Sequence, residues 1–114
     1  MSDRSGELLA GTLELMVLKA LSLEPMHGWG LAQRIEQMSR EVLQVSQCSL
    51  YPALQRMKRK GWIRSDWRTT ANNRRARYYL LTRAGARQLE REKASWETAY
   101  RAVNWVLGSE GGTA

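Results

Sequence analysis

The segment from Leu13 to Leu21 carries apolar side chains on almost every side of the helix it would form. Such a helix belongs in the centre of a core, so the rest of the chain has to pack around it. With 114 residues, the chain suffices for one domain and is too short for two. Pro25 ends the helix, because proline and the residue before it disfavour the helical conformation. We expect Thr12 to cap its beginning, since a threonine hydroxyl accepts hydrogen bonds from free backbone N–H groups.

Two shorter helices follow, and the second of them has two different faces. Apolar residues at three- and four-residue spacing predict a helix over roughly residues 28–39. Ser46 is a good N-cap for a third helix over residues 47–60, which Gly61 ends. One side of this third helix carries an apolar stripe of Leu50, Leu54 and Met57. The opposite side, predicted to be exposed and cationic, carries Pro52, Gln55, Arg56 and Arg59.

The next segment has the pattern of a β-hairpin. Residues 62–69 combine aromatic and β-branched residues with a charge at every second position, which is typical of a half-exposed strand. Residues 77–82 read as a second strand. Between them, Asn72 and Asn73 tolerate the left-handed conformation that a tight turn needs. We therefore expect a hairpin with a basic tip.

Thr82 can cap a last helix over about residues 83–107, and that helix carries an apolar seam. The seam, broken only by Lys93, consists of Leu89, Trp96, Tyr100, Val103 and Leu107. At 1.5 Å per residue the helix is about 37 Å long, more than a domain of this size needs. Part of the seam then lacks a partner within its own chain, and dimerisation would supply one. Residues 1–7 and 108–114 are expected to be flexible ends.

The net charge of +7 is concentrated in one part of the chain. Residues 56–77 contain nine basic residues and one acid, Asp66, which gives +8, whereas the remainder carries nine basic residues and ten acids. A run of Lys and Arg can be no more than a solvated face. Here it covers the exposed face of the third helix and the hairpin, and this placement favours a polyanionic partner.

Composition excludes several other classes of protein. A single Cys and a single His cannot form an internal disulfide or a Cys/His zinc site. No pairing of nucleophile and base, no paired carboxylates and no Gly-rich phosphate loop is present, so we expect no enzyme activity, no cofactor and no metal. Glu14 and Lys19 interrupt the most apolar segment, which leaves no signal peptide or membrane span and predicts a soluble, cytoplasmic protein.

The order helix, helix, helix, hairpin is that of a winged helix-turn-helix, a mainly α fold with a small β-hairpin. The residues also resemble a family at four places: residues 49–57 (Ser-Leu-Tyr-Pro-Ala-Leu-Gln-Arg-Met), residues 60–63 (Lys-Gly-Trp-Ile), residues 77–82 with Gly85, and residues 27–29 (His-Gly-Trp). Together they resemble the PadR family of bacterial transcriptional regulators. The resemblance implies a homodimeric winged helix-turn-helix, usually a repressor, with a DNA-binding domain over residues 8–82. Residues 83–107 would form the single dimerisation helix of the smaller subfamily.

The resemblance assigns Ser49, Tyr51 and Pro52 to the start of the recognition helix, where family members approach DNA. A helix N-terminus and a tyrosine hydroxyl both suit phosphate oxygens. Tyr51 lies on the flank of the apolar stripe, so packing against the second helix is an alternative role for it. One turn further on, Gln55 and Arg56 suit base edges, since Gln pairs with adenine and Arg with guanine. We expect Arg59 to contact phosphate.

Residues 70–77 resemble the basic wing of the family. The residues expected to reach DNA are Asn72, Asn73, Arg74, Arg75 and Arg77. Their arginines suit either a narrow minor groove or backbone phosphates, and the sequence leaves both open. Arg77 has a further alternative, an ion pair with Asp66 across the hairpin.

Two residues raise the possibility of sensing. Cys48 stands beside a cationic region in the first turn of the third helix, which is the setting of redox-sensing cysteines, and a tolerated small residue is the alternative. The resemblance implies that Trp96 stacks on flat aromatic effectors at the dimer centre, although a packing role is equally compatible with the seam. The other tryptophans, expected in the core or an interface, are Trp29, Trp62, Trp67 and Trp105.

These features predict a homodimeric repressor of a near-palindromic DNA operator in the bacterial cytoplasm, associated with the nucleoid when bound. Two alternatives stay open. One is a sensor of aromatic compounds or of oxidation whose output is release of DNA. The other is a basic architectural or RNA-binding protein without sequence preference.

Overall fold

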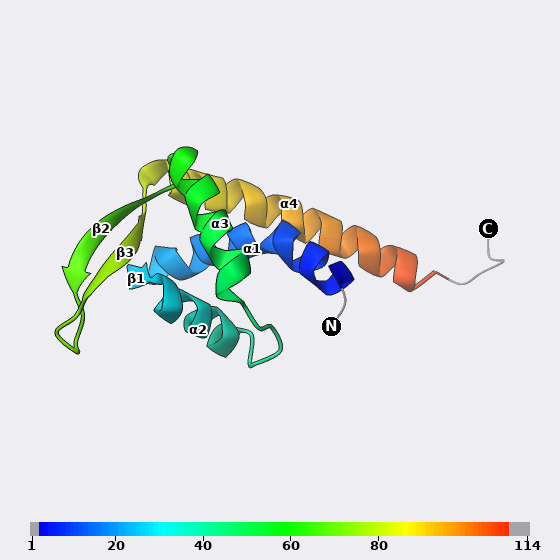
Figure 1. The fold of residues 1–114 in the computed structure, drawn as a ribbon. Coiled ribbons are helices and arrows are strands. Elements are labelled where there is room, and N and C mark those ends of the chain that lie inside the picture. Colours follow the sequence, from blue (N-terminus) through cyan, green and yellow to red (C-terminus); the bar gives the residue numbers. More distant parts are fainter. Residues whose placement is uncertain (1–2, 110–114) are drawn as a thin grey trace.

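The computed structural model describes residues 3–109, with side chains from Thr12 onward. Its elements are α1 (Asp3–Leu23), β1 (Met26–His27), α2 (Gly28–Met38), α3 (Gln47–Arg59), β2 (Ile63–Thr69), β3 (Arg75–Leu81) and α4 (Arg83–Leu107). Figure 1 shows the sheet at one end of the molecule and α4 extending towards the other. The expected fold class is therefore confirmed. Of the ends expected to be flexible, residues 1–2 and 110–114 lie outside the described part of the chain.

Helix α1 begins earlier than the sequence analysis proposed. It starts at Asp3, so Thr12 lies inside the helix and is not its N-cap. The preceding stretch Glu-Leu-Leu-Ala at residues 7–10 consists of good helix formers. Because adding residues to an existing helix is far easier than nucleating one, such a stretch extends α1 without a cap at Thr12.

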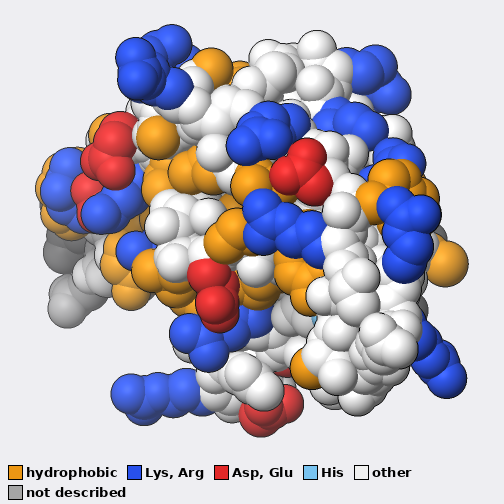
Figure 2. Space-filling model, turned by 90° about the vertical axis from the view of Figure 1, so that its left-hand side faces the viewer, with side chains coloured by type: hydrophobic (Ala, Val, Ile, Leu, Met, Phe, Trp, Pro, Cys, Tyr) orange, Lys and Arg blue, Asp and Glu red, His pale blue; other side chains and the backbone are white. Residues whose placement is uncertain are grey.

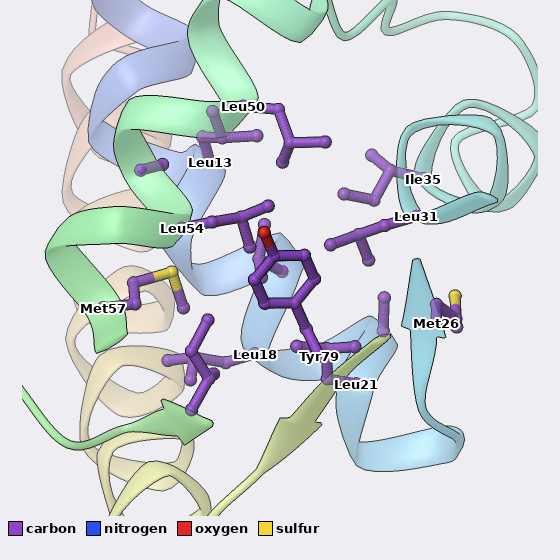
Figure 3. Packing of buried hydrophobic residues seen from close by; sticks show 14 of the residues in the cluster. Leu13, Leu18, Leu21, Met26, Leu31, Ile35, Leu50, Leu54, Met57 and Tyr79 are labelled. Carbon is purple, nitrogen blue, oxygen red and sulfur yellow. The ribbon is translucent and has the colours of Figure 1, made fainter. Parts of the chain in front are cut away.

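The core lies between α1, α2, α3 and the sheet. Figure 3 shows side chains of α3 and α2 pointing towards one another, with Tyr79 of β3 reaching in between them. The largest side chains that are fully buried are Val17, Leu18, Leu31, Leu50, Leu54 and Met57. Val17 and Leu18 belong to α1, which confirms that the helix apolar on all sides is the centre of the fold.

The sheet has three antiparallel strands in the order β1-β3-β2. The β2–β3 hairpin was predicted, although β3 begins at Arg75 and not at Arg77. Its turn spans residues 70–74, and Asn73 adopts the expected left-handed conformation with φ 61°. Strand β1 was not predicted. It is only Met26 and His27, and it is defined by pairing with Tyr79 and Tyr78, which no local pattern reveals.

Helix α4 has the bounds that were predicted. The hydroxyl of its N-cap, Thr82, accepts a hydrogen bond of 3.0 Å from the backbone N–H of Gly85. The first turns of α4 pack on the domain, and Leu89 is buried in the core of its own chain. Leu89 is therefore not part of an unpartnered seam, because its neighbours lie within the same chain.

Most of the tryptophans lie outside the core. Trp62 packs against the core cluster while partly exposed, as predicted. In contrast, Trp29, Trp67 and Trp105 are exposed, which contradicts a core position for them. An interface position remains the alternative.

Candidate nucleic-acid interface

Helix α3 is fixed by its cap and by its apolar face. The hydroxyl of Ser46 accepts a hydrogen bond of 3.2 Å from the N–H of Ser49. In the turn before α3, the carboxylate of Glu36 accepts a hydrogen bond of 3.0 Å from the N–H of Val45. Since the apolar stripe is buried, the opposite face is presented to solvent. The residues of α3 that were assigned to DNA are all exposed: Ser49, Tyr51, Pro52, Gln55, Arg56 and Arg59.

Tyr51 packs against α2, one of the two roles that the sequence left open, and is also partly exposed. Its hydroxyl lies against the start of α2, where a Cβ added to Gly28 would be only 3.2 Å away. The side chain is nevertheless 47% exposed. Tyr51 also influences a buried neighbour, Tyr79. Burial raises the pKa of Tyr79, Tyr51 raises it further, and Arg77 lowers it. Tyr51 thus packs on α2 and still offers a surface to a ligand.

Arg56 is held by its own chain. Its Nε donates a hydrogen bond to Oε2 of Glu14 on α1 over 3.1 Å, and the Glu14 side chain is only 17% exposed. Arg59, one turn nearer the end of α3, has no ion pair with any carboxylate in the described part of the chain. The two arginines therefore differ in how freely they can reach an external anion.

The hairpin carries the second cationic surface. The tip residues assigned to DNA, Asn72, Asn73 and Arg74, are exposed. Asp66 lies within 3.4 Å of Arg64 and 3.6 Å of Arg68, and the strand register places it opposite Tyr78. The proposed ion pair between Asp66 and Arg77 is therefore wrong, because Arg77 projects from the other face of the hairpin.

Arg77 instead faces an aromatic ring. The strand register places it directly opposite Trp67, and its guanidinium carbon lies 5.0 Å from the centre of the indole. The guanidinium carbon of Arg75 lies 5.3 Å from the same ring. Both arginines were predicted to belong to the wing, whereas Trp67 was not predicted as part of the site. The strand pattern could have revealed it. Side chains alternate between the two faces of a strand, and in a hairpin this alternation places Trp67 on the same face as arginines of the neighbouring strand.

These surfaces lie at the sheet end of the molecule. Figure 2 views that end and shows Lys and Arg side chains spread over the face, with fewer acidic groups between them. The arrangement joins an exposed helix face to a basic hairpin. Such a combination can place a helix in a DNA groove and arginines on the flanking backbone.

A groove of a different kind is lined by helices alone. A cavity of about 470 Å³ opens between α1 and α4, with Leu15 on one side and Trp96 on the other. Trp96 lies 6.2 Å from Tyr100 between ring centres, and both are exposed. The polar wall includes Gln88, whose amide donates to Glu92 over 2.8 Å. One wall of the groove is thus α1 with Leu15, and the other is a face of α4 that carries both the polar side chains and the indole of Trp96.

Other site chemistry is limited in the described residues. Cys48 is a free, exposed thiol in the first turn of α3. Within residues 3–109, no group of three or more metal-binding side chains comes together. Among the helices described there, none has the length and apolar character needed to cross a membrane.

Comparison with known proteins identifies the family. The model of the transcriptional regulator PadR-like family matches residues 17–91. A PadR-like transcriptional regulator from Bacillus cereus is 31% identical, with a TM-score of 0.78 and coverage of 91% of this chain and 99% of its own. A PadR family transcriptional regulator from Eggerthella lenta is 27% identical, with a TM-score of 0.78 and coverage of 95% of this chain and 92% of its own. The chain belongs to the PadR-like family of transcriptional regulators, and its role is therefore DNA-binding regulation.

Proposed function

We propose that the protein is a homodimeric repressor that binds a near-palindromic DNA operator. The observation that carries the proposal is the pair of exposed cationic surfaces on α3 and on the hairpin. Figure 1 shows both elements in the half of the molecule that holds the sheet. In this arrangement α3 enters the major groove, and residues 70–77 contact the adjacent backbone or minor groove. The protein would act in the bacterial cytoplasm, at the nucleoid when bound.

The residues of α3 that are proposed to contact DNA differ in their roles. Gln55 is exposed and has the amide needed to pair with adenine, whereas Arg56 has to leave Glu14 before it can contact guanine. Ser49 and Tyr51 lie near the start of α3 and suit phosphate oxygens, as does Arg59. Two-fold symmetry then requires half-sites separated by about 34 to 36 Å, or a multiple of that distance.

The dimer is proposed to form through α4. After Leu89, the predicted seam is exposed: Trp96, Tyr100, Val103 and Leu107. Trp105 and Val106, which the seam did not include, are exposed as well. The exposed seam favours association with a second copy, because its burial removes apolar area from water, whereas Trp105 lies on the opposite side of α4.

The decisive experiment enriches bound fragments from a genomic DNA pool and measures the affinity of the recovered consensus at several salt concentrations. We expect a consensus with two half-sites and a slope of log K against log salt of roughly −5 to −9 for the dimer. The consensus should bind about 10³-fold more tightly than random duplex. Recovery of no consensus would overturn the repressor and favour a basic architectural or RNA-binding protein.

A second candidate function is recognition of a planar aromatic effector. The groove between α1 and α4 favours it, because the indole of Trp96 forms part of the wall. Titration with planar aromatic compounds should quench tryptophan fluorescence and lower the affinity for DNA. Trp96→Ala should abolish both effects. Quenching that persists in this variant would place the effector elsewhere.

A further inference from the structure

The two faces of the hairpin have different charge balances. On one face, Arg64 and Arg68 share the carboxylate of Asp66. On the other face, Arg75 and Arg77 form no ion pair with any carboxylate that the structure describes. Side chains alternate between the faces of a strand, so this division follows directly from the register of β2 and β3. The first face keeps one net positive charge from its two arginines, whereas the second keeps both of its positive charges.

The charged face is organised around Trp67. The indole is 55% exposed, and the guanidinium groups of Arg75 and Arg77 both lie over it. A ring face attracts each cation, while the two cations repel one another. An anion that approaches both guanidinium groups removes this repulsion. The arrangement therefore favours the binding of a negatively charged group beside Trp67.

The same face of the sheet continues towards α3. Tyr79 and Ile63 lie on it nearer the core, in the alternation that includes Trp67, and both are buried. Figure 3 shows Tyr79 directed between the side chains of α3 and α2. An anion beside Trp67 would thus lie on the side of the hairpin that faces α3. A DNA duplex with α3 in its major groove presents backbone phosphates to the flank of that helix.

We infer that Trp67 is a positioning residue for DNA binding: its indole holds Arg75 and Arg77 side by side so that they bind the phosphate backbone next to the groove read by α3. An arginine side chain loses considerable rotational freedom when it binds a phosphate. A ring that already orders both side chains reduces this loss and so raises the affinity. The inference rests on the proposed function.

The test compares Trp67→Ala with Trp67→Tyr on the full-length protein and the enriched operator. We expect Trp67→Ala to weaken binding by roughly 5- to 10-fold, because the charges remain but are no longer ordered. Trp67→Tyr keeps a ring under the arginines and should restore the affinity to within about twofold. Thermal unfolding of both variants establishes that they are folded at the temperature of the assay.

A double-mutant cycle separates positioning from a merely structural role. In a background carrying Arg75→Gln and Arg77→Gln, replacement of Trp67 by Ala should have no further effect on operator affinity. The matched control is Arg68→Gln, since Arg68 also lies over an aromatic ring, that of Tyr78, but on the other face, where it is paired with Asp66. Arg77→Gln should reduce the slope of log K against log salt by the amount expected for about one phosphate contact per subunit, and Arg68→Gln should reduce it less.

The outcomes distinguish a failure of the role inferred for Trp67 from a failure of the proposed function. If the wild-type protein binds the operator and Trp67→Ala binds it equally well, or loses the same affinity with and without the two arginines, the inference is overturned while the proposed function stands. If the wild-type protein binds no duplex in a salt-dependent way, the proposed function fails and the inference fails with it.

Discussion

Gly85 and Gly61 are required for two different physical reasons. A Cβ on Gly85 would overlap the backbone carbonyl oxygen of Trp62 and approach Leu81, so the first turn of α4 could not lie against the start of the hairpin. Gly61 has open space around it but adopts a left-handed conformation with φ 79°. The first glycine provides room, and the second provides a backbone conformation that other residues rarely adopt.

The two substitutions should therefore differ in size. Gly85→Ala is expected to lower the free energy of unfolding by about 2 to 3 kcal/mol, because backbone atoms must move apart. Gly61→Ala should lower it by about 1 kcal/mol, the typical penalty for a left-handed alanine. Urea denaturation followed by circular dichroism measures both. A Gly85→Ala variant as stable as the wild type would show that α4 does not depend on this close approach.

Tyr79 should make the free energy of unfolding fall at alkaline pH. Burial, with a contribution from Tyr51, raises its pKa above the ordinary value of 10.0. A raised pKa in the folded state means that the stabilisation is fully present below pH 10 and is lost as the pH rises above it, because the unfolded chain ionises first. Wild-type protein should thus lose stability above pH 10 relative to Tyr79→Phe. Equal alkaline profiles for the two proteins would contradict the buried environment of this hydroxyl.

At the scale of elements, α1 and α3 are joined by the ion pair between Glu14 and Arg56. The pair withholds one cation from the face of α3 that is proposed to read DNA. Replacing Glu14 by Gln removes a carboxylate beside that face and releases the guanidinium. Because the Arg56 side chain is 44% exposed, solvent screens the pair, which contributes only about 0 to 1 kcal/mol to stability.

Glu14→Gln should consequently strengthen binding to random duplex and make it more salt-dependent. The expected increase in the slope of log K against log salt is about 0.9 per subunit, as for one additional phosphate contact. Fluorescence anisotropy with a labelled non-operator duplex at several salt concentrations measures it. Glu36→Gln is unsuitable as a control because Glu36 supports the turn before α3, whereas Glu24→Gln removes an exposed carboxylate elsewhere. An unchanged slope in Glu14→Gln would show that Arg56 does not reach DNA.

The elements could be predicted from the sequence where local chemistry determines them. Thr82 and Ser46 were predicted as caps because a hydroxyl before an apolar-periodic segment can accept hydrogen bonds from free N–H groups, and both side chains do so. Thr12, predicted on the same ground, lies inside α1, because residues earlier in the chain extend that helix. Strand β1 and the partners of Asp66 depend on which residues the fold brings together. From the sequence alone, Arg77 was a possible partner of Asp66 across the hairpin. The register of the two strands directs the two side chains to opposite faces, so they do not meet.

At the scale of the whole molecule, the shape is too extended for a self-contained domain. The radius of gyration is 16.5 Å and the longest dimension is 63 Å, whereas a compact domain of about this length has a radius near 13 Å. Helix α4 causes the difference, as Figure 1 shows, because it projects beyond the core. The shape of the molecule and the exposed apolar seam in the second half of α4 both support the proposed dimer. In the proposed dimer, contact through the second half of α4 would leave the two sheet ends apart, as a two-fold symmetric operator requires.

Placing negative charge on the exposed seam of α4 should both separate the subunits and weaken operator binding. In the variant that combines Val103→Glu with Leu107→Glu, two carboxylates per chain would have to be buried in the interface without partners, which is strongly unfavourable. Sedimentation velocity should show the monomer, and operator affinity should fall by about 10²-fold or more because a single α3 reads only one half-site. Thr98→Glu adds a charge on the opposite side of the same helix and should leave both the dimer and the affinity intact. If the double variant remains dimeric, α4 beyond Leu89 is not the interface. If it becomes monomeric yet binds the operator as tightly as the wild type, the protein does not read its site as a symmetric pair.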